Sequence, residues 1–380
     1  METKKYRFDE VTINFDKKRI PLSSAQREKR QGTFRYYGAQ GVIDHVDDYI
    51  FDGTYLLIAE DGENLKSKKQ NIAQVVDGQF WVNNHAHIVQ GNEQCDTRFL
   101  CYLINSMDLS GYVTGSAQPK LSQANLNAVT LSLPTLAEQK RIVEYLYMLD
   151  QKIDVNRQIN DNLEQQAQSY FQELFVDNAD PEWAIGTISD LGTIVGGSTP
   201  SKAKPEYYTE SGIAWITPKD LSINKSKFVS HGENDITELG LKNSSAAIMP
   251  EGTVLFSSRA PIGYIAIAAG EVTTNQGFKS VVPKPEIGTP FVYFFLKNTL
   301  PVIEGMASGS TFKEVSGSTM KNVPAVIPDA ETLAKFSDFC APIFAQQRIL
   351  EEQNQSLATL RDNLLPKLMS GEIDVSAVQL

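Results

Sequence analysis

Two stretches of the chain share a pattern in which mostly apolar side chains recur at alternating steps of four and three residues. The first runs from Ile142 to Leu174 and the second from Phe336 to Leu368. This spacing places one stripe of side chains along a helix face and is typical of a coiled-coil seam. The pattern therefore predicts two long helices. Their seam residues include Ile142, Leu146, Leu149, Ile153, Asn160 and Leu163 in the first, and Phe336, Ile343, Leu350, Asn354, Leu357 and Leu364 in the second.

Each predicted helix has local start and stop signals. Thr135 with Glu138 three residues later forms a capping box, and Asp329 is a good N-cap at the matching place in the second stretch. The first helix should end near Asp177 to Pro181, and the second at Gly371. Asparagines at seam positions cost stability but fix which helix pairs with which and in what register.

The chain is an internal repeat. Residues Gly115 to Leu174 align with Gly309 to Leu368 at a constant offset of 194, and Asn84-His85-Ala86 matches Asn275-Gln276-Gly277 further upstream. If a pseudo-twofold axis relates the two copies, their helices run antiparallel. A seam from Ile142 to Leu174 then gives a rod of roughly 48 Å at a rise of 1.5 Å per residue.

Short runs rich in β-branched and aromatic residues, broken by Gly, Pro and Asn, precede each helix. They predict an α+β protein, with two repeated mixed α/β domains separated by two long antiparallel coiled-coil helices. The expected parts are residues 1–133, a globular domain; 134–180, a helix; 181–328, the second domain; and 329–380, the second helix.

Composition limits the functional classes. The 380 residues are 41% apolar, and the net charge of −11 argues at first against a nucleic-acid or membrane coat. Residues 134–180 and 329–380 hold 8 basic and 17 acidic groups, so nine of the eleven excess charges lie on the helices and each globular domain is nearly neutral. Three scattered cysteines fit reduced thiols in the cytoplasm, and we expect neither secretion nor a membrane span.

Catalytic and metal motifs are missing. No two glycines stand two positions apart, and there is no Gly-Lys-Ser or Gly-Lys-Thr loop, so dinucleotide binding and NTP hydrolysis are unsupported. His85 and His87 precede Cys95 and Cys101, which is formally enough for a metal, but Gln276 and Phe278 replace the histidine pair in the second copy. A shared metal role is excluded.

Basic, amide and aromatic residues cluster in matching segments of the two copies. Such side chains hold phosphates and read base edges. For any single lysine a solvated surface is the favoured explanation, and only the clustering in matching segments favours the functional one. The candidate DNA-binding residues are Arg35, Tyr37, Lys68, Asn84 and Lys120 in the first domain, and Lys202, Lys204, Lys219, Arg259, Asn275, Gln276 and Lys313 in the second.

The sequence resembles the DNA-specificity subunits of type I restriction–modification systems over nearly its whole length. The motifs that carry the resemblance are Leu136-Ala137-Glu138-Gln139-Lys140-Arg141-Ile142-Val143, Trp215-Ile216-Thr217-Pro218-Lys219-Asp220-Leu221, Asn275-Gln276-Gly277-Phe278 and Leu364-Leu365-Pro366-Lys367-Leu368-Met369-Ser370-Gly371-Glu372. The second helix departs from the family between Phe336 and Cys340, where the Ala-Glu-Gln-Lys pattern of the first is absent.

The resemblance implies a non-catalytic chain whose two target-recognition domains each read one half of an interrupted DNA site. It implies that the helices set the spacing and dock two modification (methyltransferase) subunits, joined by restriction (nuclease) subunits. No cofactor is expected on this chain, and S-adenosylmethionine, ATP and Mg²⁺ are expected on the partners. A solitary DNA-binding regulator and a structural coiled-coil scaffold without a nucleic-acid role remain as alternatives, and an enzyme is the least favoured.

Overall fold

The computed structural model describes residues 2–68, 70–115, 118–309 and 313–373. The parts of the aligned repeat at 116–117 and 310–312 lie outside these ranges. The chain divides into two compact units: unit 1 holds Met1–Ile153 and Ser356–Leu380, and unit 2 holds Asp154–Gln355. Among the described residues, no helix is both long and apolar enough to cross a membrane.

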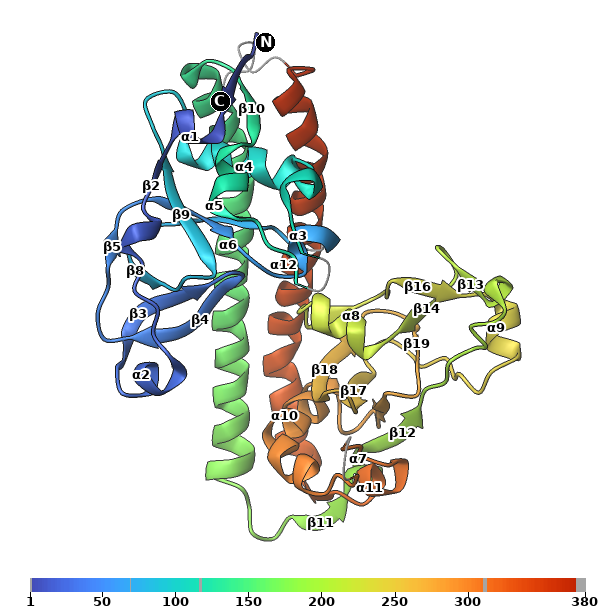
Figure 1. The fold of residues 1–380 in the computed structure, drawn as a ribbon. Helices are drawn as coiled ribbons and strands as arrows, with labels where there is room; N and C mark the ends of the chain where they lie inside the picture. The colour runs from blue at the N-terminus through green and yellow to red at the C-terminus, as the bar shows by residue number, and fades with distance from the viewer. Residues whose placement is uncertain (1, 69, 116–117, 310–312, 374–380) are drawn as a thin grey trace. The chain divides into compact units, whose positions relative to one another are not determined.

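Unit 1 builds its globular part from short strands and helices (Figure 1). In chain order they are β1 (Lys4–Arg7), α1 (Phe8–Val11), β2 (Thr12–Asn14), η1 (Asp16–Lys18), α2 (Ser24–Glu28), β3 (Gln31–Gly38), β4 (Gly41–Val46), β5 (Phe51–Asp52), β6 (Tyr55–Ala59), α3 (Asn64–Ser67), β7 (Ala73–Val76), β8 (Gln79–Val82), β9 (Ala86–Gly91), α4 (Thr97–Ser106), η2 (Ser110–Tyr112), α5 (Gln123–Asn127) and β10 (Thr130–Leu133).

These strands form two four-stranded sheets and a ribbon. One sheet has the order β2-β9-β6-β7 and is antiparallel throughout, while the other, β4-β3-β8-β5, contains the parallel pair β3 and β8. The ribbon pairs β1 with β10, which ends directly before the long helix. The main core packs α4 between the first sheet and that helix, with Phe99, Ile104 and Leu146 fully or almost fully buried.

The elements of unit 2 correspond in part to those of unit 1 and differ in the middle of the domain. They are β11 (Ala184–Thr187), α7 (Ile188–Leu191), β12 (Gly192–Gly196), η4 (Pro205–Tyr207), β13 (Tyr208–Thr209), β14 (Ile213–Ile216), α8 (Pro218–Ile223), β15 (Phe228–Val229), β16 (Asn234–Ile236), α9 (Glu238–Lys242), β17 (Val254–Ser258), β18 (Ile262–Ala268), β19 (Thr273–Thr274), β20 (Lys279–Pro283), α10 (Thr289–Gly305), α11 (Gly317–Lys321) and β21 (Pro324–Ile327).

The sheets of unit 2 share part of their connectivity with those of unit 1. One sheet has five strands in the order β12-β20-β17-β18-β15, and the other has the order β13-β16-β14-β19. The order β12-β20-β17-β18 corresponds to β2-β9-β6-β7, and the parallel pair β14 and β19 corresponds to β3 and β8. The ribbon β11–β21 matches β1–β10, and α10 and α11 match α4 and α5. The predicted repeat and the α+β class are confirmed. The β-rich run from Phe80 to Val89 forms two strands, β8 and β9, because a turn at residues 83–85 divides it.

The two long helices are α6 (Leu136–Gln172), which continues as a π-helical turn over Glu173–Asp177, and α12 (Ala330–Ser370). Each contributes one part to each unit, and within each unit the two parts run antiparallel (Figure 1). In unit 1 the Arg361 guanidinium lies 2.7 Å from the Asp150 carboxylate. In unit 2 Asn156 Nδ2 donates to Asn354 Oδ1 at 2.9 Å, and Phe171 packs against Phe336.

The caps form as the sequence predicts. The Thr135 amide and hydroxyl both donate to Glu138, and the Thr332 amide donates to Asp329 Oδ1 at 2.8 Å. The second helix ends at Ser370, directly before Gly371, whose φ of 76° is the left-handed conformation that favours glycine.

A buried ionic cluster fastens the sheet of unit 2 to its helices. Lys227, only 8% exposed, precedes β15, and its Nζ lies 2.8 Å from Glu164 on α6 and 2.9 Å from Gln347 on α12. The ammonium also sits 3.5 Å from the centre of the Phe344 ring. Lys297 on α10 approaches the other oxygen of Glu164 at 2.5 Å. The charge of Lys227 therefore anchors the sheet to the two helices.

Candidate nucleic-acid interface

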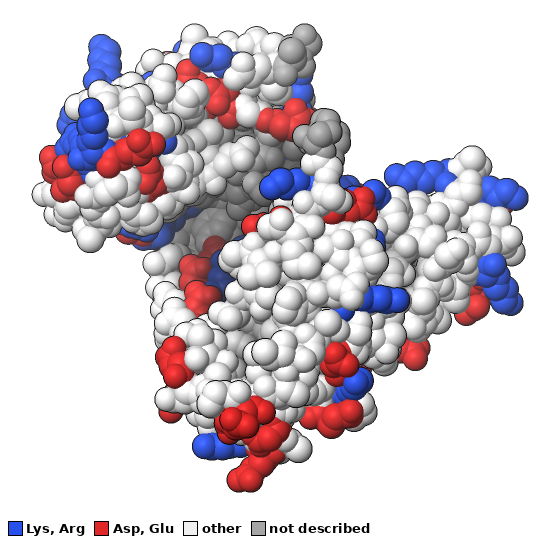
Figure 2. Space-filling view, turned by 90° about the horizontal axis from the view of Figure 1, so that it is seen from below, with Lys and Arg blue, Asp and Glu red and all other residues white. Residues whose placement is uncertain are grey.

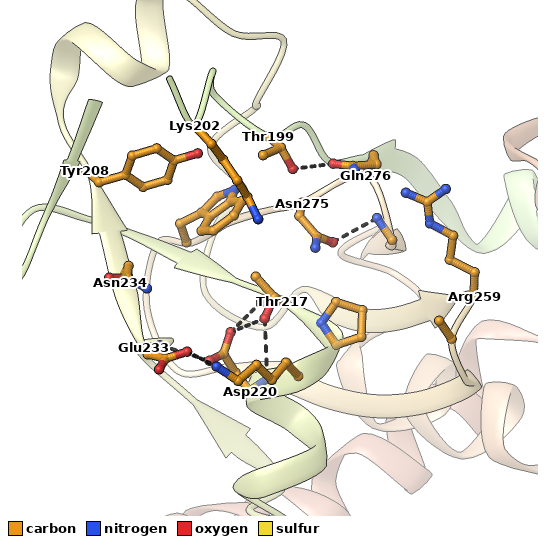
Figure 3. Close-up of a pocket in the computed structure, with 15 residues that line it drawn as sticks. Thr199, Lys202, Tyr208, Thr217, Asp220, Glu233, Asn234, Arg259, Asn275 and Gln276 are labelled. Carbon is orange, nitrogen blue, oxygen red and sulfur yellow. Dashed lines mark hydrogen bonds and ion pairs between the residues drawn. The ribbon is translucent and has the colours of Figure 1, made fainter. Parts of the chain in front are cut away.

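A polar pocket of about 620 Å³ opens on unit 2 where its two sheets meet (Figure 3). It collects side chains from segments far apart in the sequence. Its lining residues are Thr199, Lys202, Tyr208, Trp215, Thr217, Pro218, Lys219, Asp220, Glu233, Asn234, Arg259, Ala260, Asn275, Gln276 and Gly277.

A close approach of the backbone brings the segment after β12 to the pocket. The Ser198 amide donates to the Thr274 carbonyl at 2.8 Å. A Cβ on Gly197 would lie 2.1 Å from the Asn275 carbonyl oxygen and 2.3 Å from that of Thr274, so only glycine fits between them. This contact fixes Thr199 and Lys202 above the end of β19.

The start of α8 forms the lower side of the pocket in Figure 3. Thr217 caps the helix, and its amide and hydroxyl donate to Asp220 Oδ2 at 2.7 and 2.6 Å, while the Glu233 amide donates to Oδ1 at 2.9 Å. Lys219 pairs with the Glu233 carboxylate, and this hydrogen bond raises the pKa of Lys219. Both carboxylates in the pocket are therefore occupied by donors of the protein itself.

Asn275, Gln276 and Gly277 form a tight turn after β19. The Asn275 amide donates to the Ile216 carbonyl at 3.1 Å, and the Gly277 amide donates to Asn275 Oδ1 at 2.8 Å. The Thr199 hydroxyl donates to Gln276 Oε1. Both side-chain amides are held in place, with their oxygens engaged (Figure 3).

Arg259 lies at the far side of this turn, directly after β17. Its guanidinium approaches Glu314 at 3.4 Å, and the side chain is 37% exposed, so most of its five N–H donors face solvent. Lys279 lies 3.8 Å from the same carboxylate, and burial lowers its pKa below the ordinary value.

Five of the seven candidate residues of the second domain meet in this one pocket. They are Lys202, Lys219, Arg259, Asn275 and Gln276. The other two lie elsewhere: Lys204 is exposed beside the Tyr207 ring, and Lys313 borders a separate cavity of about 600 Å³ next to Arg259.

The candidates of the first domain are not gathered into a comparable pocket of the described residues. Arg35 is exposed and donates to the Asp77 carbonyl at 2.7 Å. Lys68 pairs with Asp108 at 3.0 Å, and Lys120 with Glu60 at 3.2 Å. All three cations keep exposed faces. Asn84 is also exposed, and its carbonyl lies 3.4 Å from Arg19.

Tyr37 has to be reassigned. Only 5% of it is exposed, and its ring packs edge-on against Phe80 within the sheet core. Burial raises the pKa of its hydroxyl. It therefore has no free ring face to offer to a base. Both faces of this end of β3 are covered, since the preceding Tyr36 on the opposite face is fully buried as well.

The structural match between the two turns is shifted by one residue from the sequence alignment. In unit 1 the Asn83 amide donates to the Tyr37 carbonyl, and the His85 amide donates to Asn83 Oδ1. Asn83 thus plays the part of Asn275, and Asn84 that of Gln276. The bridge Asp61–Lys120 likewise matches the bridge Arg259–Glu314, so the signs of the charges are exchanged between the two copies.

His87 serves the core of unit 1. Its side chain is 1% exposed, with Nδ1 2.6 Å from Asp16 Oδ2 and Nε2 2.8 Å from the Leu121 carbonyl. Since both neighbours accept, both ring nitrogens carry hydrogen. Burial by itself lowers the pKa of His87, but these partners outweigh it and raise the pKa. No cluster of three potential metal-ligating side chains occurs within the described ranges.

Sequence reasoning did not name six polar residues of the pocket as binding candidates: Thr199, Tyr208, Thr217, Asp220, Glu233 and Asn234. The Thr217-Pro218-Lys219-Asp220 segment carries a helix-start signature that could have placed Asp220. Nothing local marks Thr199 or Glu233, because their neighbours come from other segments.

Charge on the surface is mixed. On the face that Figure 2 shows, basic side chains stand in separate groups with acidic side chains among them. This agrees with the 12 basic and 13 acidic groups of residues 181–328.

The predicted seam residues lie where the helices face each other within each unit. All twelve are buried or half-buried. Asn160 Nδ2 donates to the Gln347 carbonyl at 3.4 Å, and Gln347 Nε2 returns a bond to the Asn160 carbonyl at 3.2 Å.

The chain contains two copies of one α/β module, each packed against long helices. In unit 2 a pocket collects basic and amide side chains. These features define a binding protein with two modules. The family model of the type I restriction modification DNA specificity domain matches residues 2–165 and 181–360. The chain therefore belongs to this family.

Named relatives agree with the family. A segment of 191 residues is 39% identical to the MjaIX specificity subunit of Methanocaldococcus jannaschii, spanning 48% of this chain and 44% of that one. The HindI specificity subunit of Haemophilus influenzae is 24% identical over 85% of this chain and 84% of its own. Both are named specificity subunits, in agreement with a non-catalytic chain.

The fold matches that of a solved S subunit from M. genitalium. The TM-score is 0.57 at 16% sequence identity, covering 97% of this chain and 96% of that one.

Proposed function

We propose that this chain is the DNA-reading subunit of a type I restriction–modification complex, and that each recognition domain binds one half of a bipartite target. The observation that carries this proposal is the pocket of unit 2, where Lys202, Arg259, Asn275 and Gln276 converge from separate segments. Cations of this kind hold phosphates, and amide and guanidinium groups read base edges.

Residues 1–133 and 181–328 are the proposed recognition domains. Unit 1 offers the exposed side chains of Arg35, Lys68, Asn84 and Lys120, which do not meet in one pocket of the described residues. Because Asp61 stands where unit 2 has Arg259, the two domains present different chemistry and should read different half-sites.

Residues 134–180 and 329–380 form the proposed spacer. The seam of α6 would separate the half-site centres by roughly 48 Å at 1.5 Å per residue, or up to about 14 base pairs at 3.4 Å per step. The acidic excess of these segments suits contact with protein better than contact with phosphate.

The proposed partners are two modification subunits and the restriction subunits. Methylation with S-adenosylmethionine and cleavage with ATP and Mg²⁺ would take place on those partners. This chain would supply the DNA sequence specificity of the whole complex.

Mapping methylated motifs in cells that carry this chain with its modification subunits tests the proposal. The expected result is one bipartite motif with a fixed gap. A continuous motif, or tight binding to a defined bipartite site by the isolated chain with no gain from a modification subunit, would reject the assembly. Affinity that does not fall steeply with salt would instead favour a scaffold.

A further inference from the structure

The pocket of unit 2 presents free hydrogen-bond donors on several side chains. A side-chain amide ordinarily offers both a donor and an acceptor, and that pair of groups matches adenine. Here the oxygen of Asn275 already accepts from the Gly277 amide at 2.8 Å, and the oxygen of Gln276 accepts from the Thr199 hydroxyl (Figure 3). Each oxygen keeps one further lone pair, but its direction is fixed by that bond, and the NH₂ groups are the part of both side chains that no described residue engages.

The other polar groups of the pocket strengthen this bias. Arg259 and Lys202 are donors only. The pocket's carboxylates, Asp220 and Glu233, are occupied by Thr217 and Lys219. Asn234 on β16 can offer either polarity, and the hydroxyls of Thr199 and Tyr208, whose protons are engaged, can only accept.

Resting on the proposed function, we infer that unit 2 reads guanine, whose N7 and O6 acceptors fit the donors of this pocket. Gln276 and Arg259 are the residues that read the base, and Thr199 orients Gln276. Guanine is the base whose major-groove edge shows two acceptors side by side. Adenine places a donor beside its acceptor and would oppose a donor, and cytosine offers a donor alone.

The matching place in unit 1 has the opposite character. Asp61 replaces Arg259 and accepts from His85 Nδ1 at 2.8 Å, so a carboxylate stands at the rim. The inference therefore applies to one half-site only, and the other half-site serves as an internal control.

The first experiment exchanges donor for acceptor. In the full complex with modification subunits, Gln276→Glu replaces the NH₂ group by oxygen at constant shape. Mapped methylation motifs should lose guanine at one position of one half-site, with preference falling about 10-fold or more. Thr199→Val should leave Gln276 free to turn, so that adenine is accepted beside guanine. Asn84→Asp, at the equivalent place in unit 1, should change the other half-site alone.

The second experiment changes the DNA and needs no folded variant. Replacing that guanine by 7-deazaguanine removes the N7 acceptor while base pairing is kept, and wild-type affinity should fall about 10-fold. Gln276→Glu should show a smaller loss.

The outcomes separate the two claims. A wild-type motif that is not bipartite overturns the proposed function, and the inference with it. A bipartite motif with no guanine that responds to Gln276, or full affinity for 7-deazaguanine DNA, overturns the inference alone.

Discussion

Neutralising Glu164 should loosen the attachment of the unit 2 sheet to its helices. Glu164 is the anion shared by Lys227 and Lys297, and its side chain is 23% exposed. Burial by itself raises the pKa of Glu164, but the two ammonium groups outweigh it and bring the pKa to about 2. In Glu164→Gln, Lys227 remains buried without its counter-charge. Burial has already lowered the pKa of that lysine to about 8.

The expected cost follows from the pKa of Glu164. A fall from an ordinary 4.5 to about 2 corresponds to about 3 kcal/mol of stability near neutral pH. Removing one member of a buried pair typically costs a similar 3–5 kcal/mol. Since the pKa is lower in the folded state, this contribution is complete above about pH 4.5 and is lost as the pH falls toward 2.

Urea unfolding measures this cost. In a Trp81→Phe background, fluorescence reports on Trp183 and Trp215, which both lie in unit 2. Glu164→Gln should lose about 3 kcal/mol at pH 7 and progressively less below pH 4.5. The control is Glu352→Gln. Glu352 is an exposed acid on α12, the helix that carries Gln347, and its replacement should change stability by about 0.5 kcal/mol or less. A Glu164→Gln cost below about 1 kcal/mol, or one that does not shrink in acid, would refute the reasoning.

Three further perturbations follow from contacts in the two units. His87→Gln should destabilise unit 1 most at about pH 6 and less at about pH 9, because a raised histidine pKa gives stability that is lost as the pH rises through that pKa. Trp81 fluorescence during urea unfolding measures the stability of unit 1, and an equal loss at both pH values would contradict the prediction. Gly197→Ala should cost about 1–3 kcal/mol and weaken DNA binding through unit 2, whereas Gly196→Ala, with open space around its Cβ position, should do neither in the same unfolding and binding assays. Replacing Asn156 and Asn354 together by Leu should raise the unfolding free energy of unit 2 by about 1–4 kcal/mol in the same urea assay. A fall in the unfolding free energy would show instead that the hydrogen-bonded asparagine pair stabilises the helices more than leucine packing does.

The repeat and the helices could be predicted because they rest on periodicity and local caps. The four-three spacing placed Ile142 and Phe336 on faces that are fully buried. The same kind of reasoning cannot predict that Lys227 is buried. Its partner Glu164 lies some 60 residues earlier, and no local sequence pattern indicates that the two will pair. Burial of a charge is decided by partners from other elements.

The pocket was only partly predictable for a related reason. Residue type singled out Lys202, Arg259, Asn275 and Gln276, which do meet. The alignment at Asn84 was one residue out of step, since the turn is defined by backbone bonds that leave no mark in composition. Tyr37 was predicted to contact DNA because it stands near Arg35 in the sequence, but both faces of β3 are covered at this point, so Tyr36 and Tyr37 are both buried.

Lengthening the spacer tests the central claim most directly. Seven residues inserted into α6 after Asn156 and seven into α12 before Asn354 keep the seam in phase and add about 10.5 Å. Methylation mapping with the modification subunits should then show both half-sites unchanged and the gap between them longer, by up to about three base pairs. An unchanged gap, or altered bases in either half-site, would contradict the account that two domains read the DNA and the helices set their distance.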